Sequence, residues 1–403
     1  MKILIVHEVN YLKKIIYEFQ ILPEILSMLG HEVTIIDYDD TWKTSSNGEA
    51  SGLRTRVHRG VHRAYDSASV TVLRPGMIRL PLVSRVSAAV TSGIEAYRFL
   101  RDYSPAGVLL YGLPTVGIQT LLAARQFGVP VIFRSIDILN QLVPSKVLVP
   151  VTRMMERYVY NHVDAILTVT VHLKNHVLSY GVPDRRVTVL PSGVDTTMFS
   201  GGPRNHELLR NWGIGPDDPV ILFMGTIYKF SGLDRVIRDF PRLLARHPRT
   251  KLLIVGCGES EEVLKTLALE SGIAGSVVFG GLQPYSALPD IIRSSDICIN
   301  PFELNSITRD ILPTKLFQYL ACGKPVVATS LPGTLPFLAG EEHGMIYCSL
   351  DDFADRIADL LDTPARCGEL GRKGVEVTTT NYEWKRIAET MAACMAKLSS
   401  LRR

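Results

Sequence analysis

Short apolar runs alternate along the chain with longer segments whose apolar residues recur every three or four positions. Runs of the first kind are typical of buried strands, and the longer segments are typical of amphipathic helices. This alternation predicts an α/β fold with parallel sheets. In the first half of the chain the expected strands are 2–6, 33–37, 108–111, 131–134, 165–170 and 187–190, and the expected helices are 15–29 and 115–127.

A second series of the same kind follows segment 191–211, which is rich in Pro, Gly and Asn and is therefore the predicted interdomain hinge. We expect two domains, 1–192 and 193–383. The last segment, 384–403, has helical spacing and either ends the second domain or crosses back to complete the first. The expected strands of the second series are 220–224, 251–255, 277–279, 297–300 and 325–328, and its helices include 233–246, 261–271 and 316–321.

Composition fits a globular protein of two domains, because the chain has 403 residues of which 46% are hydrophobic. No apolar run reaches the roughly 20 residues that would span a bilayer. All six cysteines lie in the second half without a CxxC pair, which argues against a zinc site or a disulfide framework. We therefore expect reduced thiols, no metal and a cytoplasmic location.

Positive charge is concentrated in the first half of the chain. Residues 1–192 carry 21 Lys and Arg against 15 Asp and Glu, whereas the remainder carries 23 against 25. Between Arg54 and Arg98, eight arginines meet only Asp66 and Glu95. This region predicts contact with an anionic membrane surface at the inner face, or simply a solvated basic surface. Nucleic-acid binding is not expected, because no aromatic platform is interleaved with the basic residues.

Segment 75–85 mixes apolar residues with Arg79 and Arg85. Apolar insertion combined with cationic attraction is the usual pattern of peripheral membrane contact. The segment therefore suggests contact with a membrane or a lipid-linked acceptor, and ordinary packing of a loop and a helix is the alternative.

Two glycine-containing turns, 224–233 and 255–260, follow expected strands of the second series. Gly225 and Gly256 end these strands, and open α/β sheets bind phosphate groups at such positions. A diphosphate could approach both backbones closely. Each turn by itself is more typical of a structural connection, since strand–Gly–helix turns occur in any α/β protein.

A more specific signal lies at 310–329. Pro313 fits the first turn of a helix that Gly323 ends. Lys315 then lies near a helix N-terminus, where a cation is unfavourable unless an anion is bound. A lysine beside exposed N–H groups is suited to hold a diphosphate, and Gln318, one turn later, could reach a ribose hydroxyl. The alternative is that both are surface side chains.

Several further segments contain recognisable motifs, namely 163–170 (VDAILTVT), 189–195 (VLPSGVD), 222–225 (LFMG), 253–258 (LIVGCG) and 278–282 (VFGGL). Together with 310–329 they resemble glycosyltransferase family 4, the retaining transferases of GT-B fold. The resemblance implies two Rossmann-like domains facing across a cleft, the first holding an acceptor and the second a nucleotide-diphospho-sugar. It also implies that the C-terminal helix crosses back to the first domain, that the anomeric configuration is retained, and that no metal or cofactor is required.

The donor site departs from the usual family pattern. The family's two glutamates, eight positions apart, correspond to Asp310 and Gln318, and its usual Arg and Lys correspond to Thr226 and Ser231. Lys229 and Lys315 are the candidates for the missing positive charge, and the changes resemble a subset of the family with a Pro-x-Lys-Leu-Phe helix start. The full donor set that the resemblance implies is Gly225, Thr226, Lys229, Ser231, Gly256, Gly258, Leu282, Asp310, Thr314, Lys315, Leu316 and Gln318.

The resemblance implies same-face attack, in which the departing phosphate oxygen takes the acceptor's proton and no protein base is essential. Asp137 and His7 follow expected strands of the first domain and could orient the acceptor. A helix-capping role for Asp137 and a structural role for His7 are the alternatives. The candidate catalytic residues are Asp137, His7, Asp310 and Lys315, and the candidate acceptor-side residues are Asn10, Tyr111, Gly112 and Arg134.

The expected function is transfer of a sugar to a lipid-linked molecule, a glycan or a secondary metabolite. There are two alternative functions. A nucleotide-sugar 2-epimerase shares the GT-B architecture but needs several carboxylates and a histidine around the sugar, which Asp310 and Gln318 match poorly. A non-catalytic sugar-nucleotide-binding subunit would explain the altered donor motif. The retained Lys315 and the intact glycines oppose that second alternative.

Overall fold

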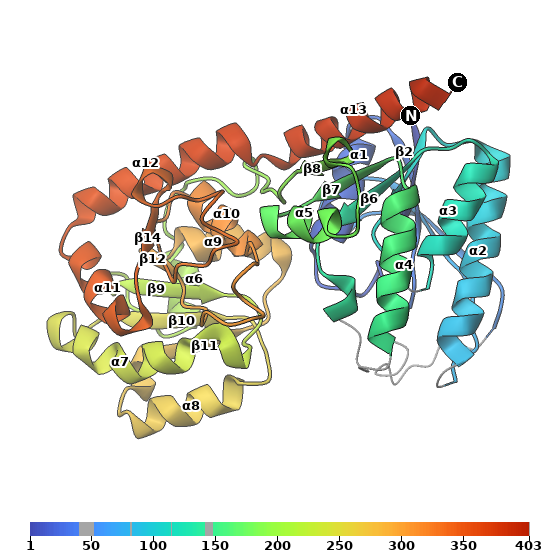
Figure 1. The fold of residues 1–403 in the computed structure, drawn as a ribbon. Coiled ribbons are helices and arrows are strands. Elements are labelled where there is room, and N and C mark those ends of the chain that lie inside the picture. The colour runs from blue at the N-terminus through green and yellow to red at the C-terminus, as the bar shows by residue number, and fades with distance from the viewer. Residues whose placement is uncertain (40–51, 81–82, 114, 142–147, 403) are drawn as a thin grey trace. The chain divides into compact units, whose positions relative to one another are not determined.

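The computed structural model describes residues 1–39, 52–80, 83–113, 115–141 and 148–402 (Figure 1). The chain forms two compact units. The first unit is Met1–Pro191 together with Lys385–Arg403, and the second unit is Ser192–Trp384. Each unit is built on one sheet with helices packed against it.

In the described part of the first unit, eight strands form one sheet in the order β3-β4-β2-β1-β5-β6-β7-β8. Neighbouring strands are parallel except β3 and β4, which are antiparallel. The succession of strands reverses between β1 and β5, which makes this pair the topological switch point. The strands are β1 (Lys2–Val6), β2 (Glu32–Ile36), β3 (Arg56–Val61), β4 (Val70–Arg74), β5 (Gly107–Leu110), β6 (Val131–Ser135), β7 (Ala165–Thr168) and β8 (Val187–Val189).

The C-terminal helix α13 (Trp384–Arg402) packs on the first unit. Arg402 donates a hydrogen bond to the carbonyl oxygen of Val129 at 3.2 Å and pairs with the carboxylate of Asp164. A Cβ added at Gly107 would lie 2.5 Å from Met395, so α13 touches the start of β5 directly. The other helices of this unit are α1 (Glu18–Met28), α2 (Val83–Tyr103), α3 (Gly117–Gln126), η1 (Leu139–Gln141), α4 (Val149–His162), α5 (Val171–Leu178) and η3 (Asp184–Arg186).

The second unit contains a parallel six-stranded sheet in the order β11-β10-β9-β12-β13-β14. Its switch point lies between β9 and β12, where an open α/β sheet ordinarily binds its ligand. The strands are β9 (Val220–Met224), β10 (Lys251–Val255), β11 (Val277–Gly281), β12 (Ile297–Asn300), β13 (Val326–Ala328) and β14 (Met345–Tyr347).

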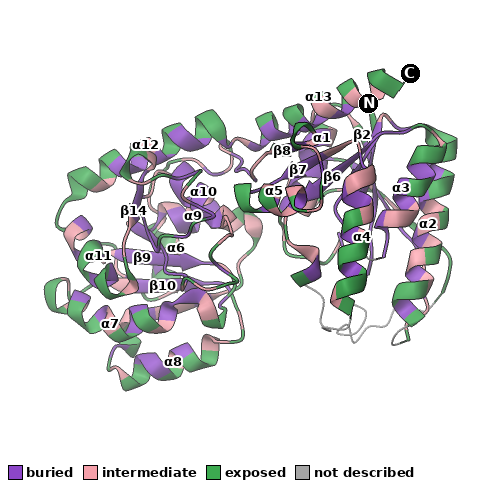
Figure 2. Cartoon of the chain, viewed as in Figure 1, coloured by how far each residue is buried: buried purple, intermediate pink, exposed green. Residues whose placement is uncertain are grey.

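Helices complete the second unit, and their apolar faces form one core with the sheet. Ile221 and Phe223 of β9 pack there with Phe240 of α7 and Phe353 of α11, all fully buried. Figure 2 shows the strands buried while the outer faces of the helices are exposed. The helices are α6 (His206–Asn211), η4 (Lys229–Ser231), α7 (Leu233–Arg246), α8 (Glu261–Glu270), η5 (Ala274–Ser276), η6 (Tyr285–Ala287), α9 (Leu288–Arg293), α10 (Thr314–Ala321), η7 (Glu341–His343), η8 (Leu350–Asp352), α11 (Phe353–Leu361) and α12 (Pro364–Asn381).

Two expected segments differ from the structure by more than two residues at one end. The helix expected at 15–29 begins only at Glu18, because the backbone N–H of Tyr17 donates to the side chain of Gln20 at 3.0 Å and caps the helix there. The predicted hinge 191–211 is too long, since its last six residues form α6. The side chain of Asn205 accepts from Leu208 N at 3.0 Å and starts that helix. None of the helices in the described part of the chain combines the length and hydropathy that crossing a bilayer requires.

Candidate functional site

The carboxyl edge of the second sheet brings together the two glycine turns. Gly225 and Gly256 have φ angles of 131° and 134°, which favour glycine. A Cβ at Gly256 would lie 2.0 Å from the carbonyl oxygen of Gly225, and one at Gly258 would lie 2.3 Å from that of Ile227. The glycines therefore allow the turns after β9 and β10 to pack against each other.

The N–H groups of both strand-ending glycines are already used within the sheet. Gly225 N donates to Val255 O at 2.9 Å, and Gly256 N donates to Gly281 O at 2.8 Å. These two N–H groups are therefore not free to bind a phosphate, although the backbone at Gly225 lies beside Lys315. A Cβ at Gly225 would be 3.8 Å from the Nζ of Lys315.

Lys315 is the central residue of this edge. It lies in the first turn of α10, after the N-cap Pro313, and only 9% of its surface is exposed. Its Nζ lies 3.8 Å from the ring centroid of Phe223 and 4.3 Å from that of Phe302. Among the described residues no carboxylate lies within ion-pair distance of this ammonium group. Burial lowers the pKa of Lys315 well below its usual range.

The surroundings of Lys315 suit an anion. The first N–H groups of an α-helix have no partner within the helix, and the helix dipole favours negative charge there. Lys315 adds a desolvated positive charge at the same helix start. The edge therefore has the chemistry of a phosphate or diphosphate site.

We expect pyrophosphate binding at this site to take up a proton. The pKa of Lys315 is lowered in the free protein, and a bound anion raises it, so the complex holds more protons between the two values. Affinity should accordingly fall as pH rises through that window. Isothermal titration calorimetry in buffers of different ionisation enthalpy should report uptake of up to about one proton. Heats that do not depend on the buffer would contradict this assignment.

Tyr319 fixes the distance between α10 and β9, and sequence reasoning did not identify it. Its hydroxyl oxygen accepts a hydrogen bond from Met224 N at 2.7 Å, and its side chain is fully buried. Burial raises the pKa of Tyr319 well above its usual range, so the hydroxyl stays neutral. The residue thereby places Lys315 beside the turn at Gly225.

Tyr319→Phe is expected to lower the free energy of unfolding by about 1–3 kcal/mol, because it leaves the buried N–H of Met224 without an acceptor. Chemical denaturation measures this effect. Tyr228→Phe is the matched control, since Tyr228 is exposed and should tolerate the change. Equal stability of the two variants would show that Tyr319 does not hold this contact.

The remaining donor candidates lie on the same unit with different exposures. Gln318 is half-buried and hydrogen-bonds to the hydroxyl of Tyr285, whose pKa is raised by burial and by the charge of Asp195. Asp310 is half-buried with its carboxylate 3.5 Å from Arg309. Thr314 starts α10 as a half-buried residue. Among the others, Thr226, Lys229 and Leu282 are exposed, whereas Ser231 and Leu316 are buried.

At the first unit's switch point, His7 follows β1 and is fully buried. Its ring lies 5.3 Å from Phe19 and 6.1 Å from Tyr11, measured between ring centroids. Among the described residues neither ring nitrogen has a hydrogen-bond partner. Burial lowers the pKa of His7 to about 3, so its imidazole is neutral and a weak base.

Arg134 and Tyr111 are both held by Glu18, a residue that sequence reasoning did not single out. Arg134 Nε lies 2.6 Å from Glu18 Oε1, and the Tyr111 hydroxyl donates to the same oxygen at 3.1 Å. Arg134 has no exposed surface and also donates to the carbonyl oxygen of Leu190. Arg134 is therefore a positioning residue behind the site. Its guanidinium is fully buried and cannot contact an acceptor directly.

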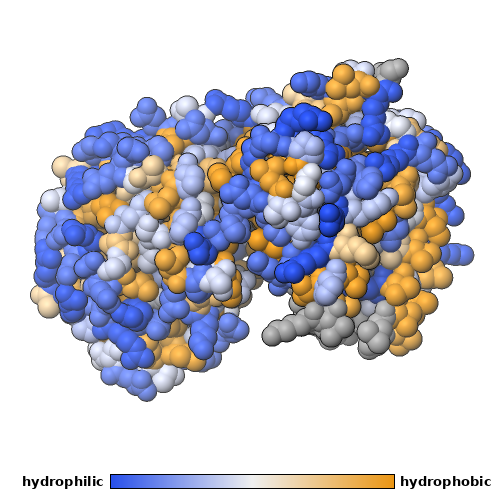
Figure 3. Space-filling view, viewed as in Figure 1, coloured by the Kyte–Doolittle hydropathy of each residue, from blue (hydrophilic) through white to orange (hydrophobic). Residues whose placement is uncertain are grey.

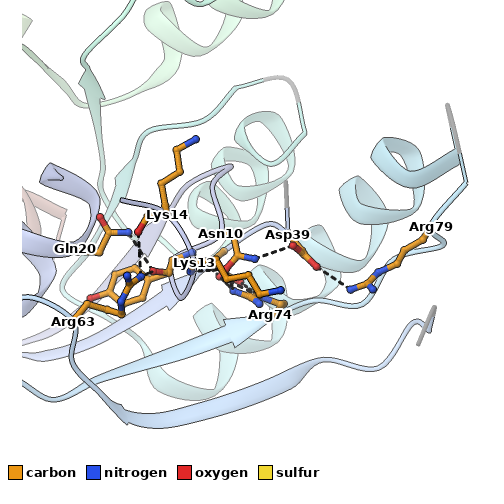
Figure 4. A network of polar contacts seen from close by, with 10 residues as sticks. Asn10, Lys13, Lys14, Gln20, Asp39, Arg63, Arg74 and Arg79 are labelled. Carbon is orange, nitrogen blue, oxygen red and sulfur yellow. Dashed lines mark hydrogen bonds and ion pairs between the residues drawn. The ribbon is translucent and has the colours of Figure 1, made fainter. Parts of the chain in front are cut away.

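Asn10 belongs to a buried polar network that Figure 4 shows. Its Nδ2 donates to Asp39 at 2.8 Å, and its Oδ1 accepts from Arg74 at 2.7 Å. Arg74 also pairs with Asp37, and Arg79 donates to Asp39 at 2.8 Å. The expected membrane contact of Arg79 therefore needs correction, because this guanidinium is largely buried against Asp39. Residues 81 and 82 of the same segment lie outside the described residues.

Glu8 and Gly112 shape the turn after β5. Glu8 accepts from Thr115 N at 2.7 Å and Val116 N at 3.3 Å, so its carboxylate holds the backbone just before α3. A Cβ at Gly112 would lie 2.6 Å from the Glu8 side chain. A larger residue at this position would therefore displace the Glu8 side chain. Asp137 is exposed beyond the end of β6, on the same sheet edge as His7 and Tyr111.

Comparison with known proteins identifies the family. Residues 23–193 match the glycosyl transferase 4-like domain, and residues 205–376 match glycosyl transferases group 1. The GDP-mannose-dependent alpha-(1-6)-phosphatidylinositol monomannoside mannosyltransferase of Mycolicibacterium smegmatis is 30% identical over 261 residues, which cover 64% of this chain and 67% of that protein. The D-inositol 3-phosphate glycosyltransferase 2 of Catenulispora acidiphila is 29% identical over 289 residues, covering 67% and 66%. The chain thus spans about two thirds of the length of these relatives.

Solved structures agree on the fold. HepE of Anabaena, determined in complex with UDP and glucose, has a TM-score of 0.72 at 14% identity, covering 98% of this chain and 100% of that chain. Sucrose-phosphate synthase of Thermosynechococcus elongatus has a TM-score of 0.67 at 16% identity, covering 99% of each chain. The two α/β units of this chain, together with its matched relatives, show that the chain belongs to glycosyltransferase family 4 and has the GT-B fold.

Proposed function

We propose that the chain is a retaining glycosyltransferase that moves a sugar from a nucleotide-diphospho-sugar to an acceptor hydroxyl. The observation that carries this proposal is the buried Lys315, which lies at a helix start beside Gly225 and has no carboxylate partner among the described residues. A desolvated cation at that place is unfavourable alone and favourable with a diphosphate. Membership of a glycosyltransferase family supplies the reaction class.

The chemistry follows from the charge that develops on the diphosphate. As the bond between the anomeric carbon and the phosphate oxygen breaks, negative charge accumulates on the departing oxygen, where Lys315 and the first-turn N–H groups of α10 stabilise it. The departing oxygen then accepts the proton of the acceptor hydroxyl on the same face, which retains configuration. His7 takes no proton in this scheme, because its low pKa makes it a weak base.

We propose a chemical class for the donor and another for the acceptor. GDP-mannose is the first donor to test, because the Mycolicibacterium smegmatis relative is named for it, and UDP-glucose is the second. The acceptor is a hydroxyl of a lipid-linked molecule, a glycan or a secondary metabolite. No metal takes part in this scheme. We place the enzyme in the cytoplasm, at an anionic membrane surface that the exposed arginines of region 54–98 approach.

Incubation of the purified chain with each nucleotide sugar tests this function. We expect slow release of the nucleoside diphosphate without acceptor, faster release with acceptor, and no loss of rate in EDTA. Nuclear magnetic resonance of the product should report the anomeric configuration of the donor. A changed sugar with the diphosphate intact would identify an epimerase instead. Donor binding without any turnover would identify a non-catalytic subunit.

A further inference from the structure

The turn after β13 packs against the segment that leads into α10. The backbone N–H of Gly333 in this turn donates to the carbonyl oxygen of Arg309 at 2.7 Å. The hydroxyl of Thr334 donates to the carbonyl oxygen of Ile311 at 3.1 Å. The two bonds reach the residues on either side of Asp310, so the turn holds the backbone there from both directions.

Gly333 leaves no room for a side chain at this contact. A Cβ added there would lie 2.3 Å from the carbonyl carbon of Asp310 and 2.4 Å from its carbonyl oxygen. Gly333 is buried and does not have a positive φ, so close approach and not backbone conformation selects glycine here. Both neighbouring atoms belong to the backbone, and an alanine at this position would therefore displace Asp310 itself.

The earlier part of the same segment is also fixed. The side-chain oxygen of Asn305 accepts from Ile307 N at 2.8 Å and from Thr308 N at 3.1 Å. Thr308 is fully buried, and its hydroxyl donates to the carbonyl oxygen of Glu303. Glu303 N in turn donates to the carbonyl oxygen of Phe230 at 3.0 Å. The segment is therefore ordered by its own contacts, and the turn with Gly333 completes them at Asp310.

The position of Asp310 gives this ordering a use. Its carboxylate is half-buried and lies five positions before Lys315, the residue proposed to hold the diphosphate. The donor's sugar is bonded to that diphosphate, and a carboxylate accepts hydrogen bonds from sugar hydroxyls. We propose that Gly333 and Thr334 are positioning residues, which hold Asp310 where its carboxylate binds a hydroxyl of the donor sugar. The inference rests on the proposed function, and neither residue is proposed to touch the substrate.

The expected signature is a split between nucleotide binding and turnover. GDP and UDP carry a diphosphate but no sugar, so their affinities should not depend on Asp310. Gly333→Ala should bind them like the wild type and should release nucleoside diphosphate from GDP-mannose or UDP-glucose about 100-fold more slowly, because a misplacement of about 1 Å costs that much. Isothermal titration calorimetry measures the binding, and hydrolysis without acceptor measures the turnover.

Thr334 allows a milder test of the same contact. Thr334→Val removes the hydroxyl and leaves the carbonyl oxygen of Ile311 without this donor. We expect turnover to fall about tenfold at unchanged GDP affinity, in proportion to the loss of one hydrogen bond. Thr334→Ser keeps the hydroxyl and should restore most of the rate.

Matched controls lie on parts of the second unit that face solvent. A Cβ at Gly201 would meet nothing within 4 Å, so Gly201→Ala is the control for Gly333→Ala. Thr266 is exposed on α8 and donates only to a carbonyl oxygen of its own helix, so Thr266→Val is the control for Thr334→Val. Figure 3 shows a largely hydrophilic surface around α7 and α8. Both controls should keep wild-type binding and turnover.

The outcomes separate positioning from a general structural role. Wild-type turnover in Gly333→Ala and in Thr334→Val would overturn the proposal, and so would equal losses of GDP affinity and turnover in both. If Gly333→Ala does not fold, the Thr334 pair decides, since a loss in Thr334→Val without recovery in Thr334→Ser would contradict a role of the hydroxyl.

Failure of the proposed function would look different. A wild-type chain that turns over neither GDP-mannose nor UDP-glucose would remove the proposed function. Calorimetry with the same two nucleotide sugars still tests the positioning in that case. Gly333→Ala and Thr334→Val should lose the extra affinity that the sugar adds over GDP or UDP, and an unchanged difference would overturn the inference.

Discussion

Replacing Lys315 with alanine is expected to weaken binding of the donor's nucleoside diphosphate about 100-fold. The substitution removes the buried ammonium at the start of α10 and leaves the diphosphate only backbone N–H groups. Loss of one partner from a desolvated charged pair costs about 3–5 kcal/mol, and solvent entering the space recovers part of it. Isothermal titration calorimetry with GDP and UDP measures the change, and turnover should fall at least as much.

Lys265→Ala is the matched control for this experiment. Lys265 lies on α8 of the same unit, is half-buried and pairs with Glu261 and Glu262. Its removal should leave nucleotide affinity unchanged. The fold should survive Lys315→Ala, because the lysine has no ion pair in the described part of the chain to break. A Lys315→Ala variant that binds nucleotide like the wild type would contradict the assignment of the site.

Gly256→Ala is expected to lower the free energy of unfolding by about 3–5 kcal/mol. The added Cβ would lie 2.0 Å from the carbonyl oxygen of Gly225 at a φ of 134°, so a steric clash and backbone strain add together. Such a loss is a large part of the stability of an ordinary domain. Chemical denaturation measures it, and nucleotide binding should fall as well, because the displaced turn adjoins Lys315.

Gly275→Ala provides the comparison for Gly256→Ala. Gly275 lies in η5 of the same unit, and an added Cβ there would meet nothing within 4 Å. This variant should be as stable as the wild type. If both variants unfold at the same denaturant concentration, the close approach of the two turns does not restrict position 256 to glycine.

Much of the fold could be predicted because parallel strands are buried on both faces and therefore form short apolar runs. Strands β1, β9, β10 and β12 have the bounds that the sequence indicates. The region 54–103 could not be assigned in this way. In the described part of the chain, β3 pairs only with β4 and exposes its arginines, and the apolar residues of α2 face outward as well as inward.

The candidate site was predictable where a residue conflicts with its local surroundings. A lysine in the first turn of a helix conflicts with the helix dipole, and this conflict singled out Lys315. Glu18 and Tyr319 gave no such signal, because their partners Arg134 and Met224 lie 116 and 95 positions away in the sequence. Arg134 was predicted to lie on the acceptor side. Its ion pair with Glu18 depends on the tertiary fold.

The central claim is that a sugar nucleotide's diphosphate binds at the start of α10. A crystal structure of the protein with GDP or with an unreactive GDP-sugar tests it most directly. We predict a diphosphate oxygen within about 3 Å of Lys315 Nζ and a second oxygen near the first backbone N–H groups of α10. A nucleotide bound at another edge of the sheet, with the Lys315 ammonium still lacking an anion, would contradict the account.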